Sequence, residues 1–221
     1  PKLSRHHASA ETAHFSQTLD WALRWALLIG VPATVALVIL AGPMLAALFQ
    51  YGEFDAHDVA MSTRSLMAFA LGLVAFMLIK VLAPGFYARK DTRSPVKYGI
   101  IAMGANTAMT LIFIWPLAHA GLALSTSLAA FLNAGMLFFN LRRRAIYQPR
   151  SGWPRFLLQL FVANLLLGVV LWFGAGDLQQ WLHASSGQRL WHLTWLIGAG
   201  GGSYVLAVLA VGIRPRHLLH A

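Results

Sequence analysis

Long apolar runs, separated by short polar turns, dominate the pattern of this sequence. An α-helix of about 20 apolar residues, rising 1.5 Å per residue, crosses the hydrocarbon core of a bilayer. Runs near that length cover approximately residues 25–49, 65–83, 98–117, 122–141, 156–173 and 190–213. Soluble helices instead show one narrow apolar stripe. The pattern therefore predicts an all-α polytopic membrane protein with six transmembrane helices.

A polar lead-in, residues 1–24, precedes the first run. Within it, Phe15, Leu19 and Leu23 recur every four positions. This spacing places them on one face of a helix, which is typical of an amphipathic helix lying on a membrane surface. We therefore expect a short cytoplasmic amphipathic helix here, separate from the first span.

Prolines mark the expected irregularities of the spans. Pro32 lies inside the first run, where a kink is tolerated if neighbouring helices satisfy the freed backbone groups. Pro84 predicts that the second span loosens near its end, because proline lacks an N–H and crowds the carbonyl one turn back. In the polar hinge that follows, Asp91 offers a side-chain oxygen to the next helix, and Pro95 fits that helix's first turn.

Composition supports the membrane assignment and excludes several functions. The chain is 58% hydrophobic and only 11% charged, about half the charged share of a soluble domain. The absence of cysteine excludes disulfides and thiol catalysis. The net charge of +10 does not indicate nucleic-acid binding, because the basic residues lie in short turns rather than in a separate basic domain. No catalytic triad, carboxylate pair or phosphate loop is visible, so the sequence shows no machinery for catalysis.

The distribution of charge predicts the topology. With both ends cytoplasmic, the inside segments hold fourteen of the seventeen Lys and Arg residues, whereas the outside segments hold only Arg64 and Arg189. Cytoplasmic loops carry such an excess of positive charge. The sequence thus divides into a four-span bundle (25–141), a basic cytoplasmic loop (142–155), two last spans (156–213) and a cytoplasmic tail (214–221).

Lys80 is the one Lys, Arg, Asp or Glu residue inside a predicted span. Charges in a membrane are costly and usually functional, which makes Lys80 a candidate substrate-binding residue. Its long side chain could instead extend toward the interface, leaving the charge in water. Both interpretations stay open from the sequence.

A second candidate site is a polar cluster on the third and fourth spans, which form a tight hairpin. Asn106 and Thr110 share one face of the third span, and the hairpin brings Thr126 and Asn133 to similar depth on the fourth. Hydrogen bonding between the spans is the simpler interpretation, because Asn and Thr commonly join transmembrane helices.

Several strings resemble the C-terminal part of the MurJ (MviN) family of lipid II flippases. They are KVLAPGFYARKDTRSPVK at 80–97, LFQYGEF at 48–54, HAGLALSTSLAAFLN at 119–133 and YQPRSGW at 147–153. The resemblance implies spans nine to fourteen of a fourteen-span transporter in the bacterial inner membrane. Such a transporter moves undecaprenyl-linked peptidoglycan precursor by alternating access, and its last two spans line a groove for the lipid tail.

The resemblance also implies partners and one candidate cofactor. The partners are lipid II, membrane lipids and an N-terminal lobe, which carries most headgroup-binding arginines in the family. Some members bind sodium on the spans that correspond to the polar cluster, so Asn106, Thr110 and Thr126 form a candidate sodium site. Thr110 stands where those members have a carboxylate, which argues against strong binding.

Two other functions remain alternatives. A related exporter of polysaccharides or drugs would share the span pattern. A non-transporting membrane scaffold for cell-wall synthesis would share it too.

Overall fold

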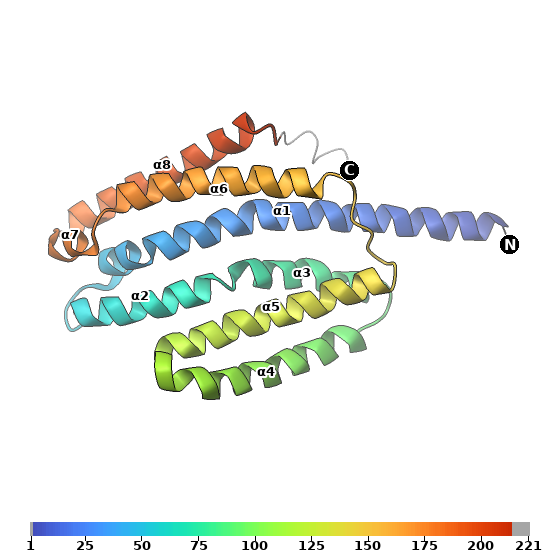
Figure 1. The fold of residues 1–221 in the computed structure, drawn as a ribbon, viewed down its shortest axis with the longest axis horizontal. Coiled ribbons are helices and arrows are strands. Elements are labelled where there is room, and N and C mark those ends of the chain that lie inside the picture. The colour runs from blue at the N-terminus through green and yellow to red at the C-terminus, as the bar shows by residue number, and fades with distance from the viewer. Residues whose placement is uncertain (1, 214–221) are drawn as a thin grey trace.

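The computed structural model describes the backbone of residues 2–213 and the side chains from His14 to Ile213. Its regular structure is entirely α-helical within this range (Figure 1). The helices are α1 (Lys2–Phe49), α2 (Ala56–Ala70), α3 (Leu73–Tyr87), α4 (Arg93–Leu117), α5 (His119–Arg143), α6 (Trp153–Ala175), α7 (Leu178–His183) and α8 (Ser186–Ala210).

The prediction of six transmembrane helices is confirmed. Six helical segments of the described chain are long and apolar enough to cross a membrane, and α2 together with α3 makes one of them, at Ala56–Tyr87. The short helix α7 lies in the connection between the last two spans.

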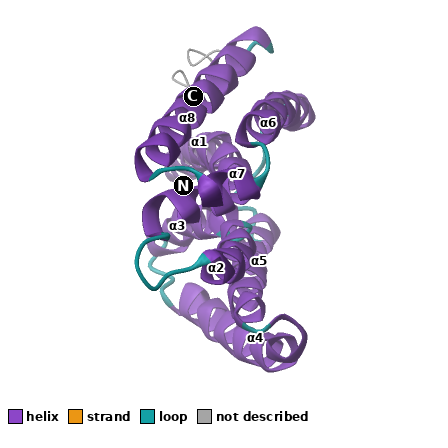
Figure 2. Ribbon diagram, turned by 90° about the vertical axis from the view of Figure 1, so that its left-hand side faces the viewer, coloured by secondary structure: helices purple, strands orange, loops and turns teal. Residues whose placement is uncertain are grey.

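The long helix α1 lies at the centre of the arrangement. It contacts α2 and α3 on one side and α6, α7 and α8 on the other (Figures 1 and 2). Helix α5 packs on α2 and α3, and α4 packs mainly on α5 at the periphery. We call the end that holds the α5–α6 connection the basic end, and the opposite end, with the α1–α2 turn and α7, the acidic end.

The lead-in differs from the expected separate helix. Helix α1 runs without interruption from Lys2 to Phe49, so the lead-in continues into the first span. Leu19 and Leu23 are buried, and together with Phe15 they pack in a cluster with Phe86 of α3 and Leu137 of α5. The four-residue spacing therefore marks a face that packs against protein, not against a membrane surface.

Pro32 behaves as predicted, because a neighbouring helix satisfies the backbone group that it frees. A proline at position 32 cannot donate to the carbonyl of Leu28, four residues earlier. The hydroxyl of Tyr204 on α8 donates to that carbonyl oxygen instead, at 2.7 Å. The hinge also starts α4 as expected, since Asp91 accepts the Ser94 N–H at 3.0 Å and Pro95 lies in the first turn.

The prediction for Pro84 is wrong. Helix α3 continues past Pro84 to Tyr87, and the N–H of Ala88 still donates to the Pro84 carbonyl at 3.0 Å. The second span is interrupted elsewhere, at Leu71 and Gly72, between α2 and α3. Pro84 removes one intrahelical hydrogen bond, the one to the Lys80 carbonyl, and the helix nevertheless continues for three more residues.

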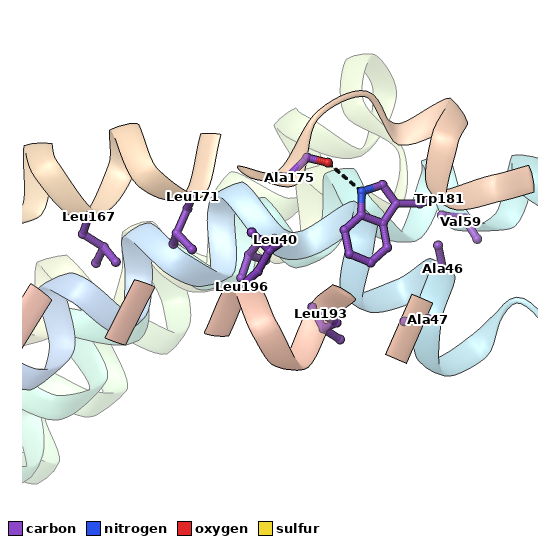
Figure 3. Close-up of a cluster of buried hydrophobic side chains, with 10 residues drawn as sticks. All are labelled: Leu40, Ala46, Ala47, Val59, Leu167, Leu171, Ala175, Trp181, Leu193 and Leu196. Atoms are coloured by element: carbon purple, nitrogen blue, oxygen red, sulfur yellow. Dashed lines mark hydrogen bonds between the residues drawn. The ribbon is translucent and has the colours of Figure 1, made fainter. Parts of the chain in front are cut away.

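Buried side chains gather separately toward the two ends. The acidic-end cluster joins α1, α2, α6, α7 and α8, and Figure 3 shows the Trp181 indole donating to the Ala175 carbonyl at 2.7 Å. The basic-end cluster joins α1, α3, α5 and the α5–α6 connection. These two clusters pack α1 against the other helices that contribute to them.

Candidate functional site

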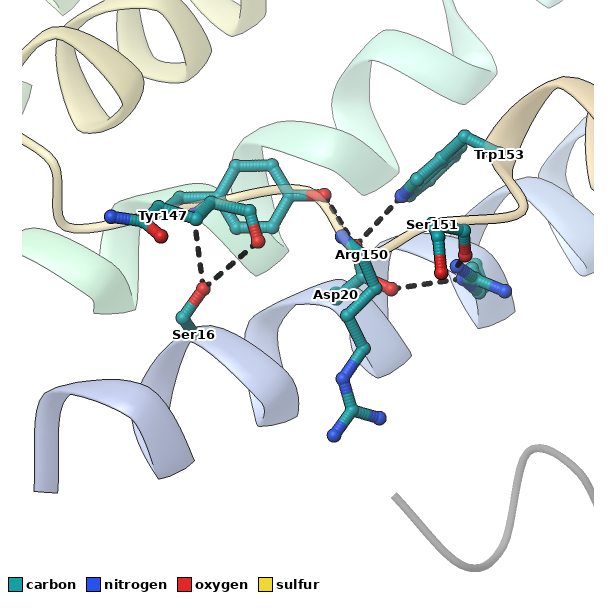
Figure 4. A network of polar contacts seen from close by, with 8 residues as sticks. Ser16, Asp20, Tyr147, Arg150, Ser151 and Trp153 are labelled. Carbon is teal, nitrogen blue, oxygen red and sulfur yellow. Dashed lines mark hydrogen bonds and ion pairs between the residues drawn. The ribbon is translucent and has the colours of Figure 1, made fainter. Parts of the chain in front are cut away.

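A buried carboxylate organises the basic end. Asp20 on α1 is only 2% exposed. Its Oδ1 accepts the Tyr147 hydroxyl and the Trp153 indole N–H, both at 2.7 Å, and the Arg150 backbone N–H at 3.3 Å (Figure 4). Its Oδ2 accepts the Arg24 Nε–H at 2.9 Å. A buried charge is tolerated when it is paired and hydrogen-bonded to this extent.

The donors to Asp20 come mainly from the α5–α6 connection, which is thereby bound to α1. Burial, and secondarily the Asp20 carboxylate, raises the pKa of Tyr147, so its hydroxyl stays protonated as a donor. Ser16 adds two contacts, because its Oγ accepts the Gln148 N–H at 3.0 Å and donates to the Gln148 carbonyl at 3.2 Å. These contacts position the start of α6 relative to the other spans.

Arg24 covers this network from the α6 side. Its guanidinium lies 5.2 Å from the centre of the Trp153 ring and donates to the Ser151 carbonyl at 3.3 Å. A cation over an aromatic face adds attraction beyond the ion pair. Sequence reasoning missed Asp20 because an acid in a polar lead-in looks like an ordinary surface residue.

The predicted polar cluster lies on two helices that contact each other, α4 and α5. The Asn106 Oδ1 and Asn133 Oδ1 atoms are buried and have no hydrogen-bond partner. Thr126 donates to the Leu122 carbonyl of its own helix at 3.0 Å. Within the described chain, no hydrogen bond joins the predicted side chains across the hairpin, so the expected interhelical bonding is not observed.

Close backbone packing joins α4 and α5 instead. A Cβ added at Gly121 would lie 2.3 Å from the Phe113 carbonyl oxygen, so only glycine fits there. The turn itself requires a positive φ of 49° at Ala118. Small residues at a helix contact allow this approach in membranes. The amide oxygens of the polar cluster are therefore left free for another ligand.

Lys80 lies on α3 with an exposed side chain. It belongs to neither buried cluster and makes no ion pair within the described residues. Since α3 stays helical through Pro84, a loosened helix end does not help the side chain to reach water. Both roles considered for Lys80 remain predictions.

An apolar cavity lies where α1, α6 and α8 meet, with a volume of about 200 Å³. Its walls include Pro32 and Leu40 of α1, Leu171 of α6, and Gly200 and Tyr204 of α8. A larger cavity of about 530 Å³ lies between α1, α2 and α6, near the α6–α7 turn. The predicted last two spans thus form an apolar surface against α1.

A buried arginine ties the acidic end together. Arg189 on α8 is 7% exposed and donates to the Ala46 carbonyl of α1 at 3.0 Å and the Leu182 carbonyl of α7 at 2.8 Å. Both carbonyls lie in the last turns of their helices, where the helix dipole favours a cation. The sequence places Arg189 in a turn and gives no signal for this burial.

The chain matches the sequences of one family of known proteins. The sequence profile described as "Lipid II flippase MurJ" matches residues 1–190. The chain is 42% identical over 219 residues to a probable lipid II flippase MurJ of Vibrio cholerae, covering 99% of this chain and 42% of that protein. It is 45% identical over 173 residues to the lipid II flippase MurJ of Burkholderia cenocepacia, covering 78% and 34%.

A solved structure has the same fold. It is described as lipid II flippase MurJ in an inward closed conformation, and it superposes with a TM-score of 0.74 over 90% of this chain and 39% of that chain. At 21% sequence identity this likeness concerns the fold alone. The chain spans less than half the length of the relatives it matches.

Proposed function

This chain belongs to the MurJ family of lipid II flippases, and we propose that it forms the C-terminal part, spans nine to fourteen, of such a flippase. The complete protein moves undecaprenyl-linked peptidoglycan precursor across the bacterial inner membrane by alternating access. The family match over residues 1–190 carries this proposal. The names of the relatives favour lipid II over the substrates of other exporters and over a scaffold role.

The role proposed for the last two spans is contact with the lipid tail. The cavity between α1, α6 and α8 has apolar walls, including Leu167, Leu171 and Ile197. Isoprenoid and acyl chains gain free energy by covering apolar surface. Its volume of about 200 Å³ accommodates a segment of an isoprenoid or acyl chain rather than a headgroup. We therefore assign the headgroup contacts to the N-terminal lobe.

We place both ends of this chain on the cytoplasmic side. Exposed Arg and Lys residues gather at the basic end, around the α3–α4 turn and the α5–α6 connection. Glu53, Asp55 and Asp177 lie at the acidic end. The excess of positive charge on cytoplasmic loops supports this orientation.

Sodium fits the polar cluster only weakly. Asn106 offers a buried, unpartnered amide oxygen, and Thr126 keeps lone pairs after donating its proton to the Leu122 carbonyl. Thr110 adds a neutral hydroxyl, but α4 and α5 contain no Asp or Glu. Hard cations prefer oxygen ligands that include carboxylates. We therefore propose that these residues hold sodium weakly unless another span supplies a carboxylate.

Reconstitution tests the proposed function. The complete protein in vesicles should carry fluorescent lipid II from one leaflet to the other faster than empty vesicles do. The 221-residue chain alone should not, because headgroup recognition is assigned to the N-terminal lobe. A complete protein that folds but gives no translocation above empty vesicles would contradict the flippase assignment, whereas activity of the isolated chain would contradict the division of labour between the lobes.

A further inference from the structure

The second span is interrupted midway, between the end of α2 at Ala70 and the start of α3 at Leu73 (Figure 1). The Gly72 N–H donates to the Phe69 carbonyl at 3.0 Å, three residues back instead of four. Short stretches of this tighter pattern inside a long helix often mark hinges. The interruption lies far from Pro84, the proline within this span.

A hydroxyl from another helix holds the interruption. Ser127 on α5 is 1% exposed, and its Oγ lies 2.7 Å from the Ala68 carbonyl oxygen and 3.2 Å from that of Phe69. Helix interruptions in membranes persist where neighbouring Ser or Thr side chains satisfy the freed backbone groups. Ser127 supplies this contact at the junction of the two half-helices.

Glycine at position 72 is required by the same contact. A Cβ there would lie 2.6 Å from the Ser127 Oγ and 2.9 Å from the Ser127 Cα. A side chain at position 72 would therefore push the backbone of α5 away from the interruption. The two segments approach each other this closely only because residue 72 is glycine.

The two half-helices belong to different cores. Val59 of α2 packs in the acidic-end cluster, whereas Leu82 and Phe86 of α3 pack in the basic-end cluster. Among the described residues, no buried cluster contains side chains from both halves. One aromatic contact crosses the interruption, with the ring centres of Phe69 and Phe76 5.6 Å apart. Phe69 is half exposed.

Helix α2 also buries fewer residues than α3 does, although both helices are 15 residues long. Only Val59 and Ala70 of α2 are buried. Segments with few buried apolar contacts open and move at lower free-energy cost than the cores beside them. Both helices contact α5, so the lower burial of α2 and its place in the acidic-end cluster are what favour motion of α2 relative to α3.

We propose that Leu71 and Gly72 form a joint at which the second span bends, and that Ser127 is the positioning residue that holds this joint. The proposal rests on the proposed transport function for its role, because alternating access needs the two ends of the bundle to move differently. The joint itself is a statement about the structure and is measured without substrate.

Spin-label distances in the complete protein, with any cysteines outside this chain replaced, test the joint. One label pair joins Arg64 of α2 to Leu122 of α5, and a second joins Tyr87 of α3 to Phe139 of α5. Ser127→Ala should broaden or shift the distance distribution of the first pair and leave the second unchanged. The matched control is Ser125→Ala, since Ser125 is equally buried but donates within its own helix, to the Gly121 carbonyl at 2.8 Å.

Each outcome decides the proposal. If Ser127→Ala leaves both distributions unchanged, or alters both alike, the second span moves as one rod and the joint is refuted. Should this variant not fold, the unmodified protein decides: a broader distribution for the α2 pair than for the α3 pair supports the joint, and equal widths refute it. Lipid II translocation is assayed separately, so loss of the proposed function would not be confused with loss of the joint.

Discussion

Tyr204 on α8 donates its hydroxyl proton to the Leu28 carbonyl of α1 at 2.7 Å, across 176 positions of sequence. This carbonyl is the one that Pro32 leaves without an intrahelical donor. The bond joins the last span to the first at the wall of the apolar cavity, which Pro32 and Tyr204 both line.

Tyr204→Phe removes this bond and keeps the ring. Hydrogen bonds between transmembrane helices average about 0.6 kcal/mol and reach about 1.7 kcal/mol. We expect a loss in unfolding free energy near the upper value, because Pro32 cannot supply the usual intrahelical N–H to the Leu28 carbonyl. Unfolding in detergent measures it, with Tyr51→Phe as control, since Tyr51 donates within its own helix turn to Ala47. Equal losses in both variants would show that the interhelical bond contributes no more to stability than a bond within one helix does.

Asp20→Asn should loosen the α5–α6 connection. The carboxylate accepts four donors, and removing one partner of a buried, hydrogen-bonded charge typically costs about 3–5 kcal/mol. Hydrogen exchange of backbone amides 146–152 should rise sharply, while amides in the middle of α5 keep their protection. Ser16→Ala, which removes only the Gln148 contacts, should raise exchange less. Unchanged exchange in Asp20→Asn would mean that the connection is held by other contacts.

The ion pair between Asp91 in the α3–α4 turn and Arg144 at the end of α5 should be lost in acid. The Ser94 hydroxyl and N–H, followed by Arg144, lower the pKa of Asp91 from 3.8 to about 2. Because the folded pKa is depressed, the stabilisation is present above about pH 4 and is lost as pH falls through about 2. Carboxyl chemical shifts during titration measure the pKa. Ser94→Ala should raise it more than Arg144→Gln does, and the reverse order would contradict the assignment of the main cause.

The six spans and the hinge that starts α4 could be predicted because their signals are local. Run length, turn charge and the position of Pro95 depend on neighbours in sequence. The lead-in was harder, since a four-residue apolar spacing at Phe15, Leu19 and Leu23 looks the same whether the face meets lipid or protein.

The contacts that hold the site were not predictable for a different reason. Ser127 and Asp20 act through partners 59 and 127 to 133 positions away, such as Ala68 and Tyr147. A single serine in an apolar span or an acid near a helix start carries no sequence signal of such a partner. Only the packing of the helices shows which polar groups meet.

The proposed orientation predicts which positions are reached from outside the cell membrane. Cysteines replacing Glu53 and Gln179, both exposed at the acidic end, should react with a membrane-impermeant thiol reagent in outer-membrane-permeabilised cells. A cysteine replacing Arg143, exposed at the basic end, should react only after the inner membrane is opened. Labelling of position 143 alone in intact inner membranes would reverse the topology.

Sodium dependence decides the role of the polar cluster. The interhelical bonds expected there are not formed, and the Asn106 amide oxygen is buried without a partner. If it were a strong cation ligand, its removal from a low-dielectric site would cost several kcal/mol, which is on the order of a thousandfold in affinity. With no carboxylate on α4 or α5, we expect transport by the complete protein to depend weakly on sodium, and Asn106→Ala to change it by only a few-fold. The control is Thr107→Ala, because Thr107 is exposed and donates to its own helix at Met103. Steep sodium dependence that disappears in Asn106→Ala but persists in Thr107→Ala would contradict this expectation and assign a strong sodium site to these spans.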